Sequence, residues 1–219
     1  MKFFKRHFQN YKARKIAYIV VVLALLTSII CTISLLANFD PLMKAELEWL
    51  QKGHFEETIT QKEILETSKT KSELYQLRHV FKSFNFILLA LFTSGFAISI
   101  AIVVNLFTNK YNGQTISKIL LTIITVSLVL TFLLLSLKPL PSARDAQLVI
   151  NGNVRIIQNF RQGMEYTAGY ISFICAWIVL IFTIIARRRF GYLTNDQTLA
   201  KKYKDTETYK LQIDEVLNS

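Results

Sequence analysis

Apolar residues are concentrated in four long runs that contain no charged side chain. These runs are residues 16–37, 84–107, 119–137 and 168–186. A helix needs about 20 residues to cross a hydrocarbon core of about 30 Å, and inside lipid a helix satisfies its own backbone hydrogen bonds. The pattern predicts an all-α integral membrane protein with four transmembrane helices. A buried helix of a soluble protein could explain one such run, but four in one short chain argue against it.

The first run follows six basic residues, an arrangement that signal peptides share. A cleaved signal peptide has an apolar region of about 7–15 residues and small residues at its exit. Here the run is longer, and Leu35 stands near its end where a small residue is wanted. We therefore expect this run to remain in the protein as a transmembrane helix.

Basic residues favour a cytoplasmic position for both ends of the chain. Residues 1–15 contain six Lys or Arg and no acid, residues 108–118 contain two Lys and no acid, and three Arg occupy 187–189. Lys and Arg accumulate in the cytoplasmic flanks of membrane proteins. The pattern predicts cytoplasmic N and C termini, with 108–118 as a short cytoplasmic loop and 187–219 as a cytoplasmic tail.

The two remaining connections are then the outer loops. Residues 38–83 carry seven basic and eight acidic residues, which agrees with this orientation. Residues 138–167 carry four basic and two acidic residues, so the contrast is weaker in the second loop.

Residues 1–15 have the pattern of a short helix at the membrane surface. Phe4, Phe8 and Tyr11 recur at helical spacing, and basic residues lie off that stripe. Such a segment rests on anionic lipid headgroups with its apolar side down; a disordered basic tail is the alternative. The expected membrane-surface contacts are Phe4, Lys5, Arg6, Phe8, Lys12, Arg187, Arg188 and Arg189.

The first outer loop is expected to form a small helical cap. Asp40 and Pro41 have the pattern of a helix start, Gly53 offers a stop, and the second membrane helix is expected to project outward from about Ser72. Apolar residues at helical spacing are Leu42, Met43, Leu47, Trp49, Leu50, Leu74, Leu77, Phe81 and Phe84. These stripes are expected to form the core of the cap, and a surface for a partner is the alternative.

The second outer loop carries a hairpin signal. Pro139 and Pro141 end the third helix, and Asn151-Gly152 lies between two short runs rich in β-branched residues. Asn-Gly provides the positive φ angles of a type I′ turn. We expect a β-hairpin here, with a helix through the same residues as the alternative.

The C-terminal tail has the pattern of an amphipathic helix. Thr194 with Gln197 forms a capping-box pattern at its start, and an apolar stripe follows at a spacing near 3.5 residues. The candidate partner contacts on this stripe are Leu199, Tyr203, Tyr209, Ile213 and Val216. A solvated tail without a partner is the alternative.

Residues that perform chemistry are scarce in this chain. The four runs contain no ionisable group, which argues against proton-coupled transport and voltage sensing, and their hydroxyl groups fit helix packing or, alternatively, a pore lining. Cys31 and Cys175 lie inside runs as packing residues, and no histidine shows metal-ligand spacing. We expect no enzyme activity, no cofactor and no metal. The net charge of +11 follows the membrane edges and does not indicate nucleic-acid binding.

The pattern as a whole favours a non-enzymatic subunit or accessory protein of a membrane complex. Its expected partners are the lipid bilayer with anionic headgroups, and other membrane subunits or a second copy of itself. The alternative is a small homo-oligomeric channel or a permease subunit. Composition favours a multi-pass protein of a plasma membrane, with the bacterial inner membrane as the first choice.

Overall fold

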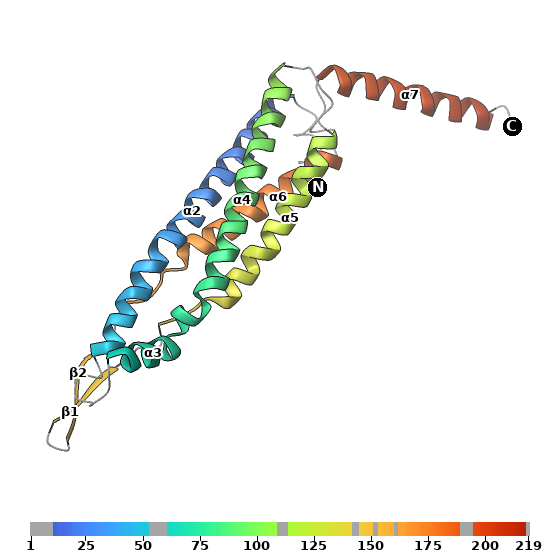
Figure 1. Ribbon diagram of the computed structural model, residues 1–219. Helices are drawn as coiled ribbons and strands as arrows, with labels where there is room; N and C mark the ends of the chain where they lie inside the picture. The colour runs from blue at the N-terminus through green and yellow to red at the C-terminus, as the bar shows by residue number, and fades with distance from the viewer. Residues whose placement is uncertain are drawn as a thin grey trace. The chain divides into compact units, whose positions relative to one another are not determined.

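A computed structural model of the chain places its helices and strands in the order shown in Figure 1. The residues that it describes are 11–52, 61–108, 114–141, 145–150, 153–159, 162–188 and 195–217. The elements are α2 (Tyr11–Lys52), α3 (Gln61–Lys71), α4 (Glu73–Thr108), α5 (Gln114–Leu137), β1 (Asp145–Ile150), β2 (Asn153–Asn159), α6 (Thr167–Arg188) and α7 (Asn195–Leu217).

Four of these helices are long and apolar enough to cross a membrane. The stretches that qualify are Lys15–Gln51, Glu73–Thr108, Ile116–Leu137 and Thr167–Ile185, and they lie in α2, α4, α5 and α6. Each contains most or all of one charge-free run. The expectation of four apolar membrane helices is confirmed, and the chain has the architecture of a multi-pass membrane protein.

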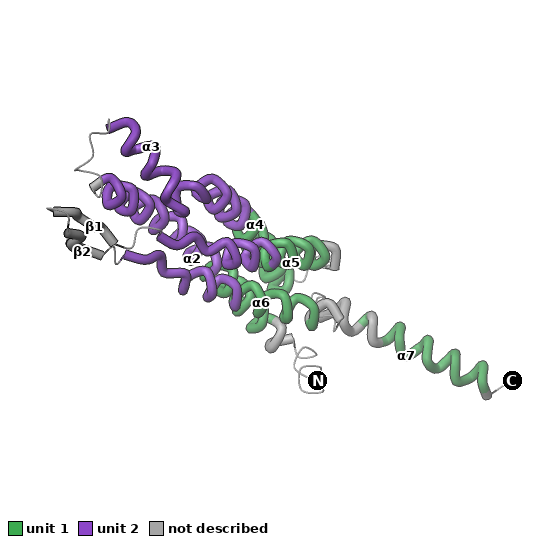
Figure 2. The backbone as a smooth tube through the Cα atoms, turned by 90° about the horizontal axis from the view of Figure 1, so that it is seen from below, with its two compact units in different colours: residues 1–27, 91–128, 175–219 green, residues 28–90, 129–174 purple. Residues whose placement is uncertain are grey.

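The chain divides into two compact units, which Figure 2 colours separately. Unit 1 comprises residues 1–27, 91–128 and 175–219. Unit 2 comprises residues 28–90 and 129–174. The units are described one at a time below.

In unit 1, α2 and α4 pack against each other in antiparallel directions. The ammonium of Lys15 lies 4.2 Å from the ring centroid of Phe107, and Leu25 lies beside Gly95 further along the pair. The buried side chains of this unit come from all four membrane helices: Tyr18, Val21, Leu25, Ile102, Leu106, Leu120, Ile124 and Val179. Apolar burial between helices thus holds unit 1 together.

In unit 2, α2 and α4 continue as an antiparallel pair. Phe39 and Phe81 stack with their ring centroids 4.5 Å apart, and Lys82 pairs with the two carboxylate oxygens of Asp40 at 2.6 and 2.8 Å. The stacked rings exclude water from the contact. The ion pair next to them fixes the register of the two helices.

The other two membrane helices also run antiparallel in unit 2. The rings of Phe132 on α5 and Phe173 on α6 lie 6.5 Å apart. Closer to the start of α6, Gly169 is buried next to Leu135. The absence of a side chain at Gly169 lets the two helices approach closely, as small residues do in membrane proteins.

The helix start expected at Asp40-Pro41 is wrong. Helix α2 is continuous from Tyr11 to Lys52 and contains Pro41. Proline removes one backbone donor from a helix, which here leaves the carbonyl of Ala37 without its usual partner. The contacts of Phe39 and Asp40 with α4 hold the helix directly before the proline, so tertiary packing overrides the local signal.

Helix α4 begins close to the expected position. Ser72 stands between α3 and α4, and its Oγ accepts a hydrogen bond from the backbone N–H of Tyr75 at 3.1 Å. This is the geometry of an N-cap. The separate helix α3, which ends just before Ser72, was not expected from the polar stretch that forms it.

The second loop contains two paired strands. β1 and β2 are antiparallel, with Ile150 opposite Asn153 and a register shift between Ala146 and Gln147. The pairing lies where the hairpin was expected. The Asn151-Gly152 turn lies outside the described residues, so its type I′ geometry stays a prediction.

Candidate functional site

The cap, defined here as residues 39–52 and 61–82 of unit 2, has an apolar core of its own. Most of the apolar residues expected to face inward are buried or half-buried in the structure. The buried ones are Leu42, Met43, Leu74 and Phe81, together with Phe39. Leu47, Trp49, Leu50 and Leu77 are half-buried. These stripes therefore contribute to the core of the cap.

A buried carboxylate joins the two sides of the cap. Glu46 of α2 is fully buried, and the hydroxyl of Ser72 donates a hydrogen bond to its Oε2 at 2.6 Å. A buried charge is costly unless hydrogen bonds compensate it. Ser72 also caps α4 through its contact with Tyr75. One hydroxyl therefore links α2 to the start of α4, a role that periodicity could not reveal because Glu46 lies among apolar positions.

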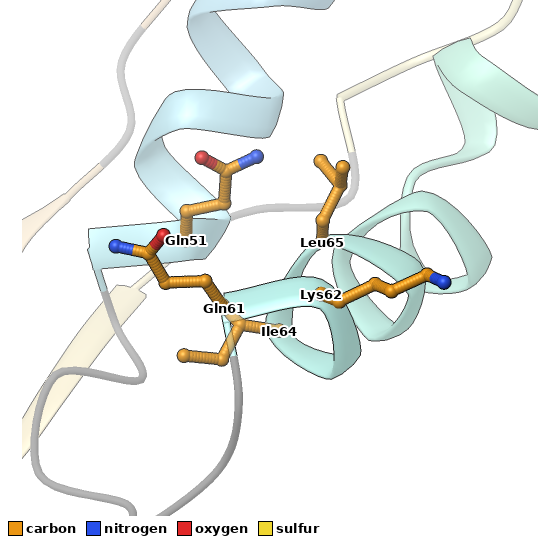
Figure 3. A pocket seen from close by; sticks show the side chains of 5 residues that line it. All are labelled: Gln51, Gln61, Lys62, Ile64 and Leu65. Atoms are coloured by element: carbon orange, nitrogen blue, oxygen red, sulfur yellow. The ribbon is translucent and has the colours of Figure 1, made fainter.

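A pocket of about 530 Å³ opens at the end of the cap (Figure 3). Its lining residues come from the last turn of α2 and from α3: Gln51, Gln61, Lys62, Ile64 and Leu65. The volume is in the range of small-molecule sites. Two amides and an ammonium offer hydrogen bonds and one positive charge, and the two aliphatic residues offer apolar contact.

The connection from α5 to α6 is fixed by a lysine among aromatic rings. The ammonium of Lys138 lies 5.5 and 5.7 Å from the ring centroids of Tyr166 and Tyr170. The buried hydroxyl of Tyr166 donates a hydrogen bond to the carbonyl of Pro139. Burial raises the pKa of Tyr166, and the charge of Glu73 raises it further. Both effects favour the protonated form, in which the hydroxyl is a hydrogen-bond donor.

Lys138 has an unusual backbone conformation at this connection. Its φ is 24°, although a residue before proline normally adopts extended angles. A non-glycine residue at positive φ is strained. The aromatic contacts of the ammonium and the Tyr166–Pro139 hydrogen bond hold this turn in place.

The hydroxyl groups of the spans divide into two classes. Thr122 and Thr125 of α5 are exposed, and each donates to a carbonyl one turn earlier in its own helix, at 3.1 and 2.8 Å. Ser99 of α4 is fully buried. Because Thr122 and Thr125 lie on the outside of unit 1 and are already hydrogen bonded, they do not form a polar path inside it.

The described residues show no arrangement suited to a metal ion, since no three His, Cys, Asp or Glu side chains gather there. His79 is exposed on α4. His7 and His54 lie outside the described residues.

The predicted partner face lies on α7 and is open to solvent in the structure. Tyr203, Tyr209, Ile213 and Val216 have exposed fractions between 57% and 75%. Leu199 lies in the same helix, but its side chain is not described. Leu211 is 69% exposed on the opposite side of the helix. The structure thus brings four of the five predicted residues onto one helical face.

The predicted membrane-surface contacts fall largely outside the described part of the chain. Phe4, Lys5, Arg6, Phe8 and Arg189 lie outside it. Lys12, Arg187 and Arg188 fall within helices α2 and α6, but their side chains are not described. Their contact with lipid headgroups stays a prediction.

Comparison with known proteins gives no relative from which a function could be transferred. No family model, no curated protein and no solved structure matches this chain.

Proposed function

We propose that this chain is a non-enzymatic subunit of a plasma-membrane complex and that α7 is its contact element. The observation that carries the proposal is the apolar face of α7. A helix of 23 residues with large apolar side chains exposed gains little stability by itself. Tertiary contacts normally supply that stability, so the face of α7 fits a helix that is covered by a partner.

The features of the cap favour α7 over the cap as the main contact element. The apolar stripes of the cap are largely used in its own core. The face of α7 remains uncovered within the described residues of unit 1. An exposed apolar stripe on a polar helix is typical of helix-in-groove and coiled-coil contacts.

The proposed orientation places α7 in the cytoplasm and the cap outside. It rests on the basic residues in and around 1–15, 108–118 and 187–189. The complex would then be assembled from the cytoplasmic side. The pocket of the cap would face the opposite side, where it is open to small molecules.

Polar substitutions on the face of α7 test this function. Tyr209→Ser together with Ile213→Ser should reduce recovery of co-purifying proteins in mild detergent by about tenfold or more, because a few buried aromatic and aliphatic residues supply most interface energy. Leu211→Ser is the matched control, since it removes an equally exposed apolar residue from the opposite side. Quantitative mass spectrometry after affinity purification measures both. Equal recovery with all three chains would contradict the proposal.

A further inference from the structure

A lysine and a tyrosine of unit 2 stand where two membrane spans end and begin. Lys138 directly follows the span Ile116–Leu137, and Tyr170 lies in the first turn of the span Thr167–Ile185. Because α5 and α6 run antiparallel here, both residues lie at the same edge of the apolar region. Lipid headgroups meet a membrane helix at this level, where lysine and tyrosine are common anchors.

The ammonium of Lys138 is held in position, but its positive charge is not compensated. It is exposed, lies beside the rings of Tyr166 and Tyr170, and donates a long hydrogen bond of 3.5 Å to the Tyr170 hydroxyl. Within the part of the chain that the structure describes, no carboxylate pairs with it. An ammonium has three donors, so two of them remain for a ligand. The Tyr170 hydroxyl accepts from the lysine and keeps its own proton to donate.

The surroundings of these donors are apolar and accessible. Leu140, Tyr170 and Ile171 have exposed fractions of 50%, 46% and 42%. The backbone of Lys138 is strained, with a φ of 24°, and strain of this kind is concentrated at sites that bind ligands. Two hydrogen-bond donors beside exposed apolar side chains fit an amphipathic molecule with an anionic head.

We propose that Lys138 and Tyr170 bind the phosphate of a phospholipid, which lies in the outer leaflet under the proposed orientation. The ammonium and the phenol hydroxyl donate to phosphate oxygens, and hydrogen bonds between charged groups of this kind are among the strong ones in proteins. The acyl chains then continue into the bilayer beside Ile171. This inference does not rest on the contacts of α7.

A free phosphate is the competing ligand, and the local charges disfavour it. Glu165 directly precedes Tyr166, and the charge of Glu73 acts on the Tyr166 hydroxyl. These carboxylates weaken the attraction of the cluster for a dissolved anion. A phospholipid is held at the membrane edge by its acyl chains. It therefore depends less on the headgroup contact and tolerates the carboxylates better.

Quenching of a local fluorophore tests this site in the full-length chain. The fluorophore is attached to Leu140→Cys in a Cys31→Ala/Cys175→Ala background, and the quencher is phosphatidylglycerol with a nitroxide on one acyl chain, in neutral detergent. Lipid bound elsewhere on the chain then contributes little to the signal. Lys138→Gly should weaken binding by about tenfold, because it removes the charged donor. Tyr170→Phe keeps both rings and should weaken binding by about threefold through the lost O–H donor.

The controls separate the phosphate contact from folding and from general attraction. Glycine adopts a positive φ without strain, so Lys138→Gly should keep the thermal unfolding midpoint of the parent chain; if it does not fold, Tyr170→Phe decides the question. Lys138→Arg, which keeps the charge, and Lys71→Gln, which removes an exposed cation of α3, should both bind like the parent chain.

The probe itself also has controls. Diacylglycerol with the same nitroxide should need about tenfold more lipid for equal quenching, because it lacks the phosphate. Unchanged affinity in Lys138→Gly or Tyr170→Phe, an equal loss in Lys71→Gln, or equal binding of the diacylglycerol would overturn the inference. Displacement of the lipid by an equal concentration of glycerol 3-phosphate would also overturn it, in favour of a site for free phosphate esters.

Discussion

Replacement of Phe81 by alanine is expected to lower the stability of the cap by about 3–5 kcal/mol. The Phe81 ring is almost completely buried and stacks on Phe39 at a centroid distance of 4.5 Å. Its removal leaves a cavity between α2 and α4, and the loss includes both buried area and the stacking contact. The midpoint of thermal unfolding in detergent measures the effect.

Phe86→Ala is the matched control for this change. Phe86 lies on the same helix five residues further on, but its side chain is 59% exposed. In a membrane this surface contacts lipid, and truncation leaves no internal cavity. We expect the midpoint to stay close to that of the wild type. Similar losses for Phe81→Ala and Phe86→Ala would contradict the packing of α2 against α4.

Valine at Gly169 is expected to destabilise the contact of α5 and α6 by about 1–3 kcal/mol. A Cβ at this position would lie 2.9 Å from Cδ2 of Leu135 and 3.5 Å from Cδ1 of Leu35. Leucine can rotate away from a single methyl group, but the branched side chain of valine also fills the space into which it would move. The same unfolding assay reports the loss.

Gly95→Ala tests whether this sensitivity is specific. The nearest atoms to a Cβ at Gly95 are side-chain carbons at 3.6 and 3.7 Å, which is ordinary contact. Alanine also favours the helix by about 0.5–1 kcal/mol relative to glycine. We expect this variant to be at least as stable as the wild type. A large loss at Gly95 with none at Gly169 would show that the helix contacts are placed incorrectly.

The membrane helices could be predicted because their signal is local and strong. A charge-free run of about 20 residues has few alternatives to a membrane helix. The face of α7 was also predictable, since residues from Tyr203 to Val216 repeat at helical spacing. Both predictions depend on the order of residues within one element and need no knowledge of neighbours.

The errors arise where tertiary contacts decide. Asp40-Pro41 has the pattern of a helix start, but the pairing of Asp40 with Lys82 keeps α2 continuous. The burial of Glu46 was not expected either, and the hydrogen bond from Ser72 compensates its charge. These outcomes depend on residues about 26 to 42 positions away in the sequence, so local periodicity could not reveal them.

The pore hypothesis illustrates the same limit. A count of hydroxyl groups in the spans could not distinguish Thr125, which is exposed and bonded to its own helix, from Ser99, which is buried. Whether a hydroxyl group of a helix is exposed or buried depends on which neighbouring helices cover that side. The structure supplies that information for the single chain, where Ser99 is buried and Thr125 is exposed.

The central claim, four spans with both ends in the cytoplasm, is tested most directly by labelling from outside. Single cysteines would be placed at Lys62, Gln162 and Lys210, which are exposed in the structure, in a Cys31→Ala/Cys175→Ala background. A membrane-impermeant maleimide added to intact cells should label the cysteines at 62 and 162, and should label the one at 210 only after the membrane is permeabilised. Labelling at 210 in intact cells, or protection at 62 and 162, would contradict the account.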